Sequence, residues 1–155
     1  MTFEETLQKD GKLIYTNVGV SMMPWIREGK DLMVIESLKE KPKMYDSVLF
    51  RRNGIEGRGK YVMHRVMKIL PNDEYYIIGD NTISGEIVKL ENIIGLLTSI
   101  RRKEGNIIYT NDPKYLKKVK LWYIFVLPIL TIYRRFKILV KKIIRYDDWR
   151  HKIGR

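Results

Sequence analysis

The feature of this sequence that most restricts its fold is a succession of short segments rich in β-branched and aromatic residues, separated by turn-forming residues. The clearest segments are residues 32–35, 47–50, 61–69, 75–78 and 106–109. The clearest turns lie at residues 52–54, 70–73 and 103–106. Segments of this length and composition are typical of β-strands, and they contain few helical periods. We therefore expect a mainly β fold, with a compact antiparallel β domain over residues 1–112.

The character of the sequence changes after Asp112. Residues 121–133 are nearly all apolar, but the run is short for crossing a bilayer and contains Pro128. Beyond it, apolar residues recur at helical spacing, at Phe136, Leu139, Val140, Ile143 and Ile144. Basic residues occupy the other positions, at Lys137, Lys141, Lys142 and Arg145. This pattern predicts a basic amphipathic helix within residues 113–155, which either binds a lipid surface or packs on the β domain.

The net charge of +12 resides in the C-terminal part of the chain. Residues 1–100 contain 14 basic and 14 acidic side chains, whereas residues 101–155 contain 16 basic and 4 acidic ones. Such asymmetry predicts an anionic partner. The long apolar run favours an anionic membrane surface over nucleic acid. Residues 1–20 lack the apolar core of a signal peptide, so we expect no signal or transmembrane segment there and a peripheral association, on the cytoplasmic side.

The absence of cysteine excludes disulfides and a thiol nucleophile. No phosphate-binding glycine loop or metal-ligand cluster is recognisable, so we expect no cofactor and no metal.

Three segments carry residues suited to catalysis. Ser21 lies between Gly19 and Pro24, in a turn where free backbone amides could stabilise an oxyanion. His64, one of two histidines, lies in a predicted strand, and the ordinary pKa of its ring, near 6.5, suits a general base. Asp80 ends another strand in Gly-Asp-Asn, where it either forms a plain turn or orients an imidazole. Taken alone, each of these three residues would more often have a structural role than a catalytic one.

Taken together and in this order, the segments resemble the superfamily of type I signal peptidases and self-cleaving SOS repressors. The segments that carry the resemblance are residues 21–24 (Ser-Met-x-Pro), 27–31 (Arg-Glu-Gly-Lys-Asp, similar to the family's Gly-Asp step into a strand), 45–50, 64–66 and 79–81 (Gly-Asp-Asn). The resemblance covers about residues 17–100. Histidine at the base position is the pattern of the endoplasmic-reticulum and archaeal type, whereas the bacterial type has lysine.

The resemblance implies a serine endopeptidase that cleaves a leader or signal segment from a peptide or preprotein, with Ser21 as nucleophile and His64 as general base. In the histidine type a further carboxylate lies a few residues after Gly-Asp-Asn, where this chain has Glu86. Asp80 and Glu86 are therefore both candidates to orient His64. The sequence departs from the pattern at Gly19, where many members have a hydroxyl residue, and at Tyr45, where glycine is usual.

Two other functions compete with this one. A self-cleaving regulator would need a DNA-binding domain, for which residues 1–16 are too short. A non-catalytic module that binds nucleic acid through its basic tail is compatible with the aromatic residues Trp122, Tyr123, Tyr133 and Trp149.

Overall fold

A computed structural model describes residues 2–16, 18–56 and 60–153, with side chains described up to Lys142. The helical elements are α1 (Phe3–Asp10), a 3-10 turn (Leu90–Asn92), α2 (Pro113–Leu121), a π-helical turn (Trp122–Val126) and α3 (Leu127–Ile153). The strands are β1 (Lys12–Thr16), β2 (Leu32–Glu36), β3 (Ser47–Arg51), β4 (Tyr61–Leu70), β5 (Glu74–Ile78), β6 (Gly85–Lys89), β7 (Ile93–Arg101) and β8 (Ile107–Tyr109).

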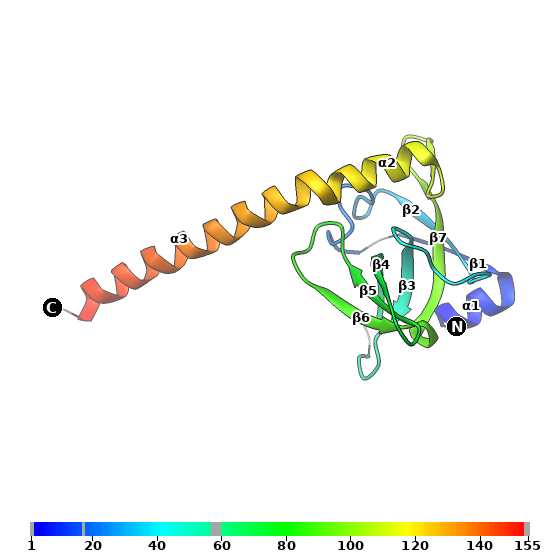
Figure 1. Cartoon of the computed structure of the whole chain (residues 1–155), viewed down its shortest axis with the longest axis horizontal. Helices are drawn as coiled ribbons and strands as arrows, with labels where there is room; N and C mark the ends of the chain where they lie inside the picture. The colour runs from blue at the N-terminus through cyan, green and yellow to red at the C-terminus, as the bar shows by residue number, and fades with distance from the viewer. Residues whose placement is uncertain (1, 17, 57–59, 154–155) are drawn as a thin grey trace. The chain divides into compact units, whose positions relative to one another are not determined.

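The strands form one eight-stranded sheet, which Figure 1 shows as strongly curved. The order across the sheet is β1-β2-β7-β3-β4-β5-β6, and β8 pairs with β7. Neighbouring strands are antiparallel throughout. The expected antiparallel β domain followed by a C-terminal helix is thus confirmed.

The five strands expected from the clearest segments all form, within a residue or two of the expected bounds. The helix α1 was not expected, although its signal is in the sequence. Thr2 caps its N-terminus, with the Thr2 hydroxyl accepting from the Glu5 amide and the Glu5 carboxylate accepting from the Thr2 amide. This reciprocal capping box is a recognised start of a helix.

Two apolar clusters pack on opposite faces of the sheet, as the alternation along β3 shows. Leu49 belongs to one cluster, whereas its neighbours Val48 and Phe50 belong to the other. The cluster around Leu49 also contains Met22 and Ile26, both fully buried. These two side chains anchor the segment that follows Ser21, because withdrawing them would expose a large apolar area.

The chain divides into two compact units, Met1–Lys120 and Leu121–Arg155. The expected boundary at residues 112 and 113 therefore differs from the observed one. Asp112 caps the N-terminus of α2 rather than ending the domain, since its Oδ1 accepts from the Lys114 amide at 2.7 Å. Tyr115 and Val119 of α2 are buried within the first unit.

The second unit is helical from its start to Ile153. Pro128 does not interrupt it, because the preceding turn widens to a π-helix in which the Leu127 amide donates to the Trp122 carbonyl. A proline lacks an amide and crowds the carbonyl one turn earlier, and the wide turn accommodates both defects. Within the described residues, we find no helix with the length and apolar character needed to span a bilayer.

Candidate active site

Ser21 begins a tight turn in the loop between β1 and β2, here called the Ser21 loop (residues 18–31). Within the turn, the Met23 amide donates to the Val20 carbonyl at 3.1 Å and the Ile26 amide donates to the Met22 carbonyl at 3.0 Å. Gly19 has a φ of 105°, a conformation that favours glycine. The turn is therefore fixed both by its own hydrogen bonds and by the buried side chains that follow Ser21.

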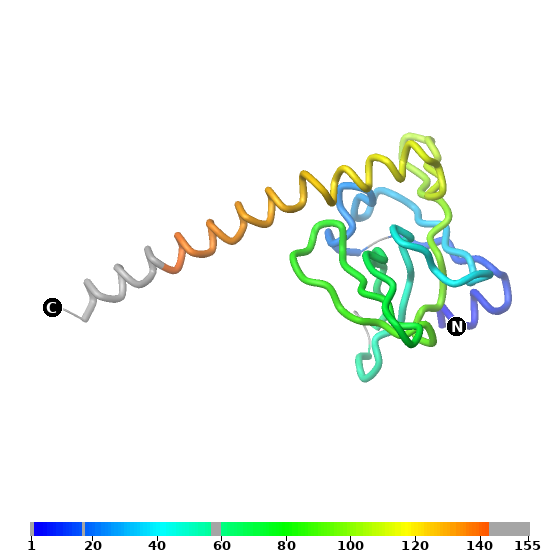
Figure 2. The backbone as a smooth tube through the Cα atoms, viewed as in Figure 1, coloured from blue at the N-terminus to red at the C-terminus, as the bar shows by residue number. Residues whose placement is uncertain are grey.

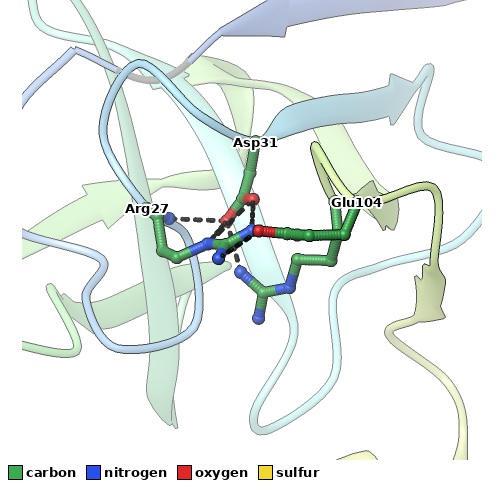
Figure 3. Close-up of polar contacts among 4 residues, drawn as sticks. Arg27, Asp31 and Glu104 are labelled. Carbon is green, nitrogen blue, oxygen red and sulfur yellow. Dashed lines mark hydrogen bonds and ion pairs between the residues drawn. The ribbon is translucent and has the colours of Figure 1, made fainter.

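The far end of the Ser21 loop is held by a cluster of charges (Figure 3). Asp31 is fully buried and accepts from the Arg27 amide at 2.8 Å, from the Arg27 guanidinium at 2.7 Å, and from Arg102. Burial raises the pKa of Asp31, but these hydrogen bonds outweigh it and hold the pKa below its ordinary value. Arg27 also donates to Glu104 at 2.7 Å, which lowers the pKa of Glu104 to about 2. The cluster ties the loop to the turn between β7 and β8.

His64 lies on β4 directly opposite Val48 of β3. It is 7% exposed, and its ring packs against that of Phe50 with centroids 6.1 Å apart. Burial lowers the pKa of His64, an effect that the nearby Glu86 partly opposes. The imidazole is consequently neutral near pH 7 and able to accept a proton.

Gly79 brings Ser21 and His64 together. A Cβ atom at this position would lie 2.8 Å from the Ser21 carbonyl oxygen and 3.0 Å from His64 Nε2. The Ser21 carbonyl oxygen and His64 Nε2 therefore lie close to one another, beside the same face of Gly79. The Asn81 amide also donates to the Ser21 carbonyl at 2.7 Å. The wide β5–β6 connection (Figure 2) thus fixes the Ser21 turn beside the histidine ring.

Glu86 of β6 lies on the other side of the same ring. Its Oε1 is 3.8 Å from His64 Nδ1, a buried nitrogen without a hydrogen-bond partner among the described residues. Arg52, just after β3, holds the Glu86 carboxylate with both its Nε, at 2.9 Å, and its Nη2. The two ring nitrogens of His64 thus face different groups, with Nε2 toward the Gly79–Ser21 junction and Nδ1 toward a carboxylate.

Asp80, the second candidate partner of His64, binds a different residue. Both of its oxygens accept from Arg65, at 2.7 and 2.8 Å, and both side chains are fully buried. Arg65 also donates to the Tyr45 carbonyl at 2.7 Å and bonds the Tyr115 hydroxyl at 3.0 Å. Of the two carboxylates that the sequence leaves open, Glu86 is therefore the one that lies 3.8 Å from a His64 ring nitrogen, whereas Asp80 is engaged by Arg65. Asp80 stabilises the turn that carries Gly79.

Tyr45 adopts a backbone conformation that favours glycine. Its φ of 76° lies in the left-handed region, which costs an ordinary residue roughly 1–2 kcal/mol. The bonds around it offset this cost, since its amide donates to the Val66 carbonyl at 2.8 Å and its carbonyl accepts from Arg65.

Sequence reasoning did not single out Arg52 or Tyr115, and it assigned Arg65 no role beyond its place in the box at residues 64–66. Arg65 and its partner Asp80 are separated by 15 positions, Arg52 and Glu86 by 34, and only the strand pairing brings them together. Among the described residues, no group of three or more His, Asp or Glu side chains is arranged to hold a metal ion. Comparison with protein-family models, with curated proteins and with solved structures finds no match to this chain.

Proposed function

We propose that this chain is a serine endopeptidase in which Ser21 is the nucleophile, His64 the general base and Glu86 the residue that orients His64. The observation that supports the proposal is that the two nitrogens of the His64 ring face different groups. Its Nε2 lies against the Gly79–Ser21 junction, and its Nδ1 lies 3.8 Å from Glu86. A Ser-His-acid triad needs this polarity, because one nitrogen takes the serine proton and the other donates to the carboxylate.

In the proposed reaction, the Ser21 Oγ attacks the carbonyl carbon of the scissile bond while His64 Nε2 takes the hydroxyl proton. The tetrahedral intermediate collapses as His64 returns that proton to the leaving amine, which breaks the C–N bond and leaves an ester on Ser21. Water then attacks the ester, again with His64 as base, and frees the serine. Because Gly19 has no side-chain hydroxyl, the Ser21 backbone amide serves as a hydrogen-bond donor to the oxyanion.

The substrate proposed from the family resemblance is a peptide or preprotein that carries a leader or signal segment, cut after small residues. Exposed apolar side chains beside the nucleophile support an apolar substrate segment. Val18 and Val20 are 66% and 52% exposed on the approach to Ser21, and Ile83 follows the Gly79–Asn81 turn with 45% exposure. Burying such side chains against an apolar peptide would favour binding.

The proposal predicts that the protein cleaves members of a proteome-derived peptide library and that Ser21→Ala and His64→Ala lower cleavage by at least about 10³-fold. New peptide ends are identified by mass spectrometry. The matched controls are Ser84→Ala, an exposed serine in the same β5–β6 connection, and His151→Ala, the other histidine. Both controls should cleave like the wild type. Cleavage that persists in Ser21→Ala, at the same sites, would refute the mechanism.

The second unit of the chain is proposed to bind the surface of an anionic membrane. Exposed apolar side chains recur along its helix every three or four residues, at Phe125, Ile129, Ile132, Phe136 and Leu139. Basic residues alternate with them, at Arg134, Arg135, Lys137, Lys141 and Lys142. A helix with this pattern binds in the interfacial plane, with each basic residue near anionic lipid contributing about 1 kcal/mol.

Flotation with vesicles tests this part of the proposal. The protein should float with phosphatidylserine-containing vesicles, less so at high salt, and Ile132→Glu/Phe136→Glu should abolish flotation. The control Ile14→Glu/Ile69→Glu makes the same change of charge at exposed apolar residues of the β domain. This control should still float with the vesicles. Retention on DNA without flotation would favour the nucleic-acid alternative instead.

A further inference from the structure

Tyr115 of α2 contacts two parts of the candidate site that are distant from one another in sequence. Its hydroxyl bonds Arg65 Nη2 at 3.0 Å, and Arg65 in turn holds Asp80. Its ring meets that of Trp25, in the Ser21 loop, edge to face with centroids 5.5 Å apart. Tyr115 itself is only 5% exposed.

These contacts hold both sides of the Gly79–Ser21 junction, which lies beside His64 Nε2. On one side, Trp25 closes the turn that Ser21 begins, and its amide donates to the Met22 carbonyl at 3.1 Å. On the other side, the Arg65–Asp80 pair supports the turn that carries Gly79. An aromatic pair and a hydrogen bond to a charged group both give directional restraint, so one side chain sets the distance between the two turns.

We propose that Tyr115 is a positioning residue for catalysis, acting through Trp25 on the Ser21 loop and through Arg65 on the Gly79 turn. The inference rests on the proposed protease function. It makes α2 a part of the catalytic domain, although nothing in its sequence resembles a peptidase box. Displacements of about 1 Å at a nucleophile can cost 10²-fold in rate.

The test compares three variants of the full chain that carries Trp122→Phe and Trp149→Phe, so that Trp25 is its sole tryptophan. Tyr115→Leu removes the ring and the hydroxyl, and should lower kcat by about 10²-fold with little change in KM. Tyr115→Phe keeps the ring against Trp25 and should recover much of that loss. Val119→Ala, also on α2 and fully buried, should keep the wild-type kcat at a temperature where every variant is folded.

Two readouts separate this inference from the proposed function. The emission of Trp25 should shift in Tyr115→Leu and stay unchanged in Val119→Ala. Suppose that the chain with Trp25 as its sole tryptophan is active and that Tyr115→Leu cleaves as fast as Val119→Ala. The positioning role of Tyr115 is then refuted, while the proposed function stands. A wild-type chain that cleaves no peptide would remove the proposed function, and the catalytic role of Tyr115 with it, whatever the emission of Trp25.

Discussion

Replacing Gly79 with alanine is expected to lower kcat/KM by about 10²-fold while the chain remains folded. The new methyl group would lie 2.8 Å from the Ser21 carbonyl oxygen, 2.9 Å from Thr82 Cγ2 and 3.0 Å from His64 Nε2. Contacts this short do not persist, so the Ser21 turn and the histidine ring must move apart. Overpacking of this kind costs typically 1–3 kcal/mol of stability, which a stable domain survives.

Gly95→Ala is the matched control for this prediction. A methyl group there would lie 2.7 Å from Ile35 Cγ2 and 3.1 Å from the Glu36 carbonyl oxygen, away from Ser21 and His64. It should therefore lower the free energy of unfolding by a similar amount without a comparable loss of kcat/KM. If both variants lose activity in proportion to their loss of stability, Gly79 has no special role at the site.

Replacing Asp80 with asparagine is expected to cost about 3–5 kcal/mol of stability, because it leaves the Arg65 charge buried without its ion-pair partner. That is a large part of the 5–15 kcal/mol that holds an ordinary domain together. The free energy of unfolding is measured by urea denaturation. Asp73→Asn, which breaks a surface ion pair with Lys41, is the control and should cost less than about 1 kcal/mol.

Glu86→Gln distinguishes the two carboxylates by function. It should lower kcat with little loss of stability, because the Glu86 side chain is 31% exposed and its partner Arg52 is 35% exposed. The opposite pattern, a stable Asp80→Asn with lost activity and a fully active Glu86→Gln, would make Asp80 the residue that orients His64.

Most of the fold follows from local sequence patterns. β2, β3, β4, β5 and β8 form where short β-branched segments are bounded by turn residues. The central strand β7, between β2 and β3, was harder to single out because it contains Gly95, and a glycine inside a strand weakens the pattern.

The candidate site was only partly predictable. Ser21, His64 and the Gly79–Asn81 turn were identified from ordered boxes, and the structure brings them together around Gly79. The choice between Asp80 and Glu86 depends on which arginine each carboxylate meets. Those pairings, with Arg65 and with Arg52, arise from strand register and from the curvature of the sheet. Local sequence carries no signal for either.

The central claim, that His64 activates Ser21, is tested most directly by the pH dependence of labelling with a serine-directed fluorophosphonate, with the labelled residue located by peptide mass mapping. The label should appear on Ser21, and its rate should rise with pH as His64 loses its proton, through a pKa below the ordinary 6.5 because burial disfavours the charged ring. His64→Ala should abolish that rise and nearly all labelling. Equal labelling of Ser21 in the wild type and in His64→Ala, or labelling confined to another serine, would contradict the account.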